Sequence, residues 1–186
     1  MTPLFTKKGD DGTTSCFGCD QKFSKSSTIA EALGSLDEIN SYLGFIKLAS
    51  KKQNLEVITG ESFFDIVSDI QQNLFIIQAE VAGAKKEIVE EKILQIEKIV
   101  NEIEKQLPPI KSFFVSGGTE LSSLFDFART IARRAERRVV AVFDEKKVEI
   151  SKNTLIYLNR LSSLLYALAR LSNHLSGIKE ESPSYK

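Results

Sequence analysis

The sequence has 186 residues, of which 42% are hydrophobic, so it is long enough for one domain with a buried core. Lysine plus arginine number 25, as do aspartate plus glutamate, and the formal net charge of zero offers no overall basic field to attract nucleic acid or an acidic membrane. No stretch approaches the roughly 20 apolar residues of a membrane span, and the N-terminus lacks a signal-peptide pattern. We therefore expect a single soluble, cytoplasmic domain over residues 1–186, with no nucleic-acid or membrane partner.

The first 27 residues are rich in Gly, Asp, Thr and Ser and show no sustained apolar period, which predicts a loop or a short strand pair. Gly9 and Gly12 permit tight turns whose N–H groups can converge on an anion. Hydroxyl and ammonium groups surround these glycines: Thr6, Thr13, Thr14, Ser15, Lys7, Lys8 and Lys25. The segment either wraps a polyphosphate or is a plain turn, and it contains no Walker A pattern.

Cys16 and Cys19 form a C-x-x-C pair, which is compatible with a zinc site, a redox pair or two reduced thiols. A closed zinc site needs about four ligands. The single histidine, His174, is far away in the sequence, and there is no second cysteine pair. We therefore favour reduced thiols and expect no metal held by protein ligands.

Five apolar stripes at helical spacing follow this segment. The first begins with a capping box formed by Thr28 and Glu31 and extends to about Ala49. The others cover residues 63–81, 89–107, 121–142 and 155–175, with Pro108 ending the third and Thr119 capping the fourth. The pattern predicts an all-α, five-helix up-and-down bundle over residues 28–177, preceded by the N-terminal loop of residues 1–27 and followed by a flexible tail, residues 178–186.

The fourth predicted helix is unusually rich in arginine. Its arginines fall on two ridges: Arg129, Arg133 and Arg137 on one, Arg134 and Arg138 on the next. A guanidinium fork matches phosphate oxygens, so this face, with Glu136 beside it, is either a polyphosphate clamp or an ordinary surface with helix ion pairs. From this pattern alone the surface interpretation is favoured.

Other polar residues interrupt the predicted helices. Asp37, Glu38 and Asn40 lie near the first apolar stripe, where they either meet a partner subunit or form an exposed flank. Asn159 in the fifth helix is explained by a ligand contact or by simple exposure. A di-iron bundle would need Glu-x-x-His pairs, which the sequence does not provide.

Three blocks taken together resemble the PduO-type cobalamin (corrinoid) adenosyltransferases. They are residues 6–15 with 31–40, residues 116–119 with 128–138, and residues 157–162. Their order and spacing cover nearly the whole chain. The resemblance favours the anion-binding interpretation of the arginine ridge, and it implies a five-helix bundle that assembles as a homotrimer with its sites at subunit interfaces.

The resemblance also implies roles for individual residues. ATP would be held by Thr6, Lys7, Lys8, Gly9, Thr14, Ser15 and Lys25 from the loop, and by Arg133, Arg134, Glu136, Arg137 and Asn159 from the bundle. Arg129 would pair with Asp37 of a neighbouring subunit. Phe113 would lie against the corrinoid and help remove its lower axial ligand, with Tyr166 extending the apolar wall.

The reaction implied is attack by Co(I) of the reduced corrinoid on the 5′ carbon of ATP, which gives adenosylcobalamin and triphosphate. The cofactors implied are ATP with Mg²⁺ and the corrinoid, with Arg133 among the catalytic residues. A corrinoid reductase and an adenosylcobalamin-dependent enzyme are possible partners. Two competing hypotheses are an ATP-binding regulator or corrinoid chaperone, and a structural bundle whose arginines only form ion pairs.

Overall fold

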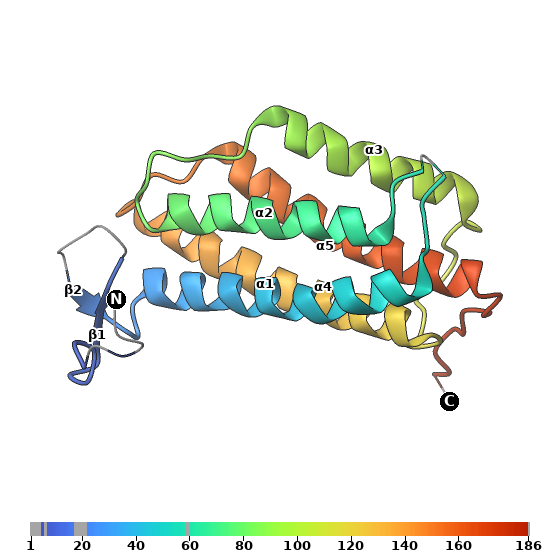
Figure 1. Ribbon diagram of the computed structural model, residues 1–186, viewed down its shortest axis with the longest axis horizontal. Coiled ribbons are helices and arrows are strands. Elements are labelled where there is room, and N and C mark those ends of the chain that lie inside the picture. Colours follow the sequence, from blue (N-terminus) through green and yellow to red (C-terminus); the bar gives the residue numbers. More distant parts are fainter. Residues whose placement is uncertain (1–4, 6, 17–21, 59, 186) are drawn as a thin grey trace.

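The chain forms a bundle of helices with a small hairpin at one end (Figure 1). The computed structural model describes residues 5, 7–16, 22–58 and 60–185, so Thr6 and Cys19 lie outside the described residues. Within them the elements are β1 (Thr13–Ser15), β2 (Lys22–Ser24), α1 (Thr28–Gln53), α2 (Phe63–Val81), α3 (Glu90–Gln106), α4 (Glu120–Glu145) and α5 (Lys152–Leu175). The all-α, five-helix prediction is confirmed, and the N-terminal segment contains the short strand pair that was one of its two expected forms.

The helices are ordered so that α1 packs against α2 and α4, while α5 packs against α4 and α3. The hydroxyl of Thr28, at the start of α1, donates to Glu145 at the end of α4 at 2.8 Å, so these two helices run antiparallel. Figure 1 places the β1–β2 hairpin beside the start of α1, and the link between α3 and α4 at the opposite end of the bundle. No helix in the described part of the chain is long and apolar enough to cross a membrane.

The apolar stripes converge on one core. Leu36 of α1, Phe63 of α2, Ile103 of α3, Phe125 of α4 and Leu165 of α5 are each fully buried. The rings of Phe63 and Phe125 meet edge to face, with centroids 5.8 Å apart. Because complete burial of one such side chain contributes about 1.5–3 kcal/mol, the stripes fix how the helices pack and leave their polar faces for the site.

The ends of α1 differ from the sequence prediction. Its N-cap is Ser27 rather than Thr28, because the Ser27 hydroxyl accepts a hydrogen bond from the N–H of Ala30 at 3.3 Å while the Thr28 hydroxyl bonds to α4. The helix also continues past Ala49 to Gln53, where Asn54 adopts a left-handed conformation (φ 48°) and ends it. Asparagine tolerates this conformation better than most residues. Because the last turn of α1 is polar, a pattern of apolar residues does not show where the helix ends.

Candidate functional site

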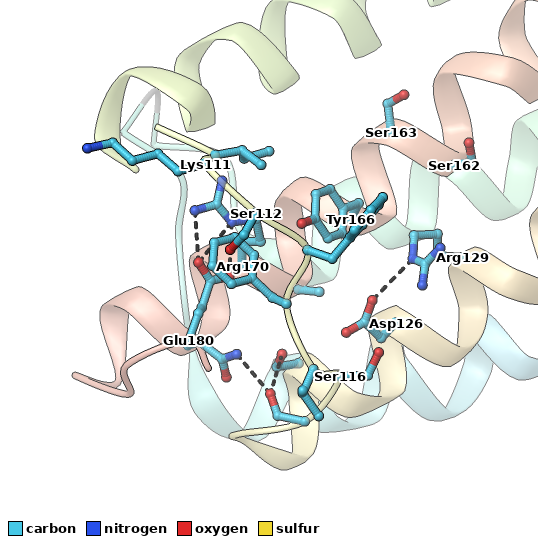
Figure 2. Close-up of a pocket in the computed structure, with 18 of the residues that line it drawn as sticks. Lys111, Ser112, Ser116, Asp126, Arg129, Ser162, Ser163, Tyr166, Arg170 and Glu180 are labelled. Atoms are coloured by element: carbon cyan, nitrogen blue, oxygen red, sulfur yellow. Dashed lines mark hydrogen bonds and ion pairs between the residues drawn. The ribbon is translucent and has the colours of Figure 1, made fainter. Parts of the chain in front are cut away.

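A cleft of about 690 Å³ opens between the first half of α4, the second half of α5 and the irregular link that joins α3 to α4 (Figure 2). The link contributes one wall, residues 110–117, which includes Phe113. The helices contribute charged and polar groups: Ser122, Asp126, Arg129, Arg133, Ser162, Ser163, Tyr166, Arg170 and Asn173. The cleft therefore combines aromatic and apolar groups of the link with polar and mainly cationic groups of the helices.

The cationic groups include Arg129 and Arg133, which lie one helical turn apart on the same face of α4. The Nε of Arg129 donates to the carboxylate of Asp126 at 3.1 Å. Its guanidinium also lies 5.8 Å from the ring centroid of Tyr166. Figure 2 shows the Asp126–Arg129 pair beside Tyr166. Arg133 is exposed and makes no ion pair with any described residue, so its charge is available to a ligand.

Two aromatic residues of the cleft are Phe113, from the link, and Tyr166, from α5. Phe113 is 81% exposed, which is unusual for a phenylalanine and leaves its ring free to contact a ligand. Tyr166 is partly buried, and this burial raises the pKa of its phenol above the ordinary value, so the group is neutral at physiological pH. Both residues assigned to the corrinoid side by the resemblance thus line the same cleft as Arg129 and Arg133.

The neighbouring arginine ridge faces α1 instead of the cleft. Arg134 pairs with Glu38, and Arg138 lies 3.6 Å from Glu31. Both pairs are exposed, and pairs of this kind contribute about 0–1 kcal/mol each. Arg134 therefore reaches a carboxylate of its own chain, and its assignment to ATP stays a prediction.

Glu136 and Asn159 meet between α4 and α5. The amide nitrogen of Asn159 donates to Glu136 at 3.1 Å, while its amide oxygen accepts from Arg160 at 2.8 Å. Arg160 in turn donates to Glu97 of α3 at 2.8 Å. These contacts orient the Asn159 amide, but neither Asn159 nor Glu136 lines the cleft.

The hairpin holds the other predicted ATP residues in a defined arrangement. The Lys25 ammonium donates to the carbonyl of Gly9 at 2.8 Å. A Cβ at Gly9 would lie 3.0 Å from the backbone carbonyl oxygen of Thr13, so this close approach favours glycine. Thr14 and Ser15 belong to β1, while Lys7 and Lys8 are exposed in the turn before it. The Lys7 backbone is left-handed (φ 60°).

Asp11 braces the hairpin. Its carboxylate accepts hydrogen bonds from the hydroxyl and the N–H of Thr13, at 2.6 and 3.0 Å, and pairs with Lys22 at 3.3 Å. These contacts, led by the Thr13 hydroxyl, lower the pKa of Asp11 to about 2. Asp11 is therefore ionised at any pH near neutral, and its contacts connect β1 to β2.

In one chain the hairpin lies beside the start of α1, whereas the link that forms one wall of the cleft lies at the opposite end of the bundle. At about 1.5 Å per residue, Arg133 lies about 18 Å along α4 from Glu145, the residue that contacts the start of α1. Asp37 is exposed on α1, and Arg129 is paired with Asp126 of its own chain. The structure therefore brings together Phe113, Arg129, Arg133 and Tyr166, but not the hairpin residues.

The cleft also contains residues that sequence reasoning missed, among them Asp126, Arg170, Asn173 and Glu180. Asp126 precedes Arg129 by one helical turn, a spacing that is itself a signal for an ion pair. Arg170 and Asn173 are polar residues within the leucine-rich end of α5, and both are only 6% exposed. A polar group in an apolar stripe indicates a buried partner, but it does not say which.

The described residues offer no preformed metal site. No cluster of three or more His, Cys, Asp or Glu side chains there is arranged to hold a metal ion. Because Cys19 lies outside the described residues, the interpretation of the C-x-x-C pair stays a prediction.

Comparison with known proteins places this chain in a defined class. A sequence profile described as cobalamin adenosyltransferase matches residues 4–172, so the chain belongs to the cobalamin adenosyltransferase family. It is 37% identical over 180 residues to a corrinoid adenosyltransferase of Bacillus subtilis, covering 94% of this chain and 89% of that protein. It is 35% identical over 178 residues to the corrinoid adenosyltransferase PduO of Citrobacter freundii, covering 92% of this chain but only half of that longer protein.

Solved structures agree with this assignment. The chain superimposes with a TM-score of 0.85, at 29% identity, on a variant of the PduO-type ATP:corrinoid adenosyltransferase from Lactobacillus reuteri, solved in complex with cobalamin and ATP. The match covers 98% of this chain and 97% of that one. The fold and family expected from the sequence are thus confirmed.

Proposed function

We propose that this protein transfers the 5′-deoxyadenosyl group of ATP to the cobalt of a reduced corrinoid, giving an adenosylcorrinoid and triphosphate. The observation that carries the proposal is one cleft lined both by an exposed aromatic ring, Phe113, and by Arg133, which has no ion-pair partner among the described residues. A flat apolar macrocycle suits the aromatic ring and a polyphosphate suits the arginine. Membership of the cobalamin adenosyltransferase family supports the same reaction.

The proposed chemistry is a single displacement. The electron pair of Co(I) forms a bond to the ribose 5′ carbon as the bond from that carbon to the triphosphate oxygen breaks, and triphosphate leaves with the bonding electrons. No protein nucleophile is needed. Arg133 would stabilise the charge that develops on the leaving oxygen, and the cleft would hold the cobalt in line with the 5′ carbon.

Phe113 and Tyr166 are proposed to form the surface against which the corrinoid lies. An exposed phenyl ring offers no lone pair to cobalt, so it can displace a lower axial ligand without replacing it. Loss of that ligand makes the Co(II) state easier to reduce. The uncharged Tyr166 adds to the apolar wall, and its raised pKa keeps it neutral in the cleft.

Mg²⁺ is proposed to arrive with ATP. Magnesium prefers oxygen ligands and commonly binds through substrate phosphates plus one or two carboxylates. Because the described residues contain no three-residue acidic cluster, the triphosphate would supply most of the ligands to the ion.

A homotrimer is proposed to complete the site. In one chain the hairpin lies beside the start of α1, away from the link that forms one wall of the cleft, whereas a hairpin from a neighbouring chain would supply Lys7, Gly9 and Lys25 to the cleft. The α1–α4 face supports such packing, because Phe45 and Phe127 are 67% and 55% exposed there.

The charges that the resemblance assigns to the interface lie on two different faces. Asp37 is exposed on α1, whereas Arg129 lines the cleft beside Tyr166 of α5, about 200° around α4 from Phe127. Pairing of Asp37 with Arg129 of a neighbouring chain is therefore proposed to form where α1 of that chain meets the rim of the cleft, in addition to the Asp126 contact within one chain. A corrinoid reductase, an adenosylcobalamin-dependent enzyme and a cytoplasmic location remain predictions of the same proposal.

The test is an anaerobic reaction of purified protein, chemically reduced cobalamin and MgATP, followed by visible absorption. We expect loss of the Co(I) spectrum and formation of a light-sensitive alkylcobalamin only when both protein and ATP are present. Folded protein that binds ATP but forms no product with confirmed Co(I) would contradict the proposal and favour an ATP-binding regulator.

A further inference from the structure

The link between α3 and α4, residues 107–119, carries Phe113 but has no regular secondary structure. Several of its backbone groups form hydrogen bonds with other parts of the chain. The amide nitrogen of Asn173 donates to the Gly117 carbonyl at 2.9 Å, and its amide oxygen accepts from the Thr119 N–H at 3.0 Å. The end of α5 thus fixes the end of the link that enters α4.

Arg170, one turn earlier on α5, fixes the other end of the link. Its guanidinium donates to the Pro108 carbonyl at 3.1 Å and lies 5.0 Å from the ring centroid of Phe114. It also forms a forked pair with Glu180, in which Nε and Nη2 reach the carboxylate oxygens at 2.8–3.0 Å. Only 6% of the Arg170 side chain and 15% of the Glu180 side chain are exposed.

The Arg170–Glu180 pair also brings the C-terminal segment against the link (Figure 2). Beyond Glu180, the Glu181 carbonyl accepts from the Val115 N–H at 2.8 Å, and the hydroxyls of Ser182 and Ser112 lie 2.7 Å apart. These contacts show that residues 180–182 pack against the link. The flexibility predicted for residues 178–186 stays a prediction. The contacts hold the link on both sides of Phe113.

The position of the link determines where the Phe113 ring lies in the cleft. Phe114 packs over Arg170, while its neighbour Phe113 is 81% exposed and lines the cleft. A shift or rotation of the link would carry Phe113 away from the arginine side. A buried charge pair resists such movement, because separating the partners leaves a charge without compensation.

We infer that Arg170 and Glu180 are positioning residues that set the corrinoid wall of the cleft through the 107–119 link. The inference rests on the proposed function, and it assigns to the pair a selective effect on the corrinoid. Arg133 is held by α4 alone and the hairpin lies at the far end of the bundle, so loss of the pair leaves the ATP side in place. A pair that served stability only would not distinguish the two substrates.

The test compares Glu180→Gln with the matched control Glu181→Gln. Both changes remove one carboxylate charge from adjacent positions, but in the described contacts Glu181 uses only its backbone carbonyl. We expect Glu180→Gln to lower kcat/KM for cob(I)alamin at least tenfold while the KM for ATP stays within twofold of the wild type. Glu181→Gln should match the wild type for both substrates.

Two results would overturn the inference: unchanged corrinoid kinetics in Glu180→Gln, or an equal loss for ATP and corrinoid. If Glu180→Gln does not fold, Glu180→Asp applies the same test, because it keeps the charge but shortens the reach to Arg170. We expect Glu180→Asp to lower kcat/KM for cob(I)alamin at least threefold and to leave the KM for ATP unchanged. An equal loss for both substrates, or no loss for either, would refute the inference. Inactive wild-type protein would instead contradict the proposed function, so the two failures are distinguishable.

Discussion

Replacement of Arg133 by alanine is the most direct test of the cationic side of the cleft. The side chain is exposed and has no ion-pair partner among the described residues, so its removal should change the free energy of unfolding by no more than about 0.5 kcal/mol. If Arg133 stabilises the leaving triphosphate, its loss should lower kcat about 10²–10³-fold, which corresponds to about 3–4 kcal/mol of transition-state stabilisation. Any part of the contact already made to bound ATP should appear as a higher KM for ATP.

The matched control is Arg138→Ala, which removes the same side chain from the same helix. Arg138 faces Glu31 of α1 rather than the cleft, and its exposed pair is worth at most about 1 kcal/mol of stability. Both variants are assayed anaerobically with saturating cob(I)alamin and varied MgATP, and their unfolding is followed in urea. Turnover in Arg133→Ala within twofold of the wild type, or an equal loss in Arg138→Ala, would refute the assignment.

Three further predictions concern the fold and the assembly. Gly118→Ala should lower the free energy of unfolding by about 2–5 kcal/mol, because φ is 113° and the new Cβ would lie 2.4 Å from the Asn173 amide oxygen. In the same urea titration Gly117→Ala, whose Cβ meets no atom within 4 Å, should lower it less. Burial raises the pKa of Tyr157, so its stabilising contribution is complete below about pH 10, the ordinary tyrosine pKa, and is lost as the pH rises further. Tyr157→Phe should therefore lose less stability than the wild type between pH 8 and 11, and parallel losses would contradict this. Asp37→Ala should shift sedimentation towards smaller species, and an unchanged trimer would argue against its interface role.

The helical part of the fold was predictable because each helix buries one continuous apolar stripe. Leu36, Phe125 and Leu165 fall on such stripes, and all three are fully buried. Helix ends depend on single polar contacts. Ser27 rather than Thr28 caps α1, because the Thr28 hydroxyl donates to Glu145 of α4 instead. Such a choice depends on a residue more than 100 positions away, which a local pattern does not contain.

The candidate site was predictable only in part, for a similar reason. Helical spacing correctly placed Arg129 and Arg133 on one face, and both line the cleft. The Arg170–Glu180 pair depends on how the C-terminal segment folds back on α5, and no spacing rule encodes that return. The resemblance to known enzymes assigned Phe113 to the corrinoid, whereas composition alone treats a phenylalanine as a core residue.

The pairing of the arginines explains how a chain with no net charge can offer an anion site. Ion pairs within the described residues neutralise Arg129, Arg134, Arg138, Arg160 and Arg170. Arg133 and Arg137 have no carboxylate partner there, and Arg137 instead donates to the Arg133 carbonyl at 3.0 Å. A paired guanidinium must lose its partner before it can bind phosphate, whereas an unpaired one loses only water. Selective neutralisation of its neighbours therefore concentrates the available positive charge of α4 at Arg133 and Arg137, which makes Arg133 the arginine of the cleft best suited to a polyphosphate.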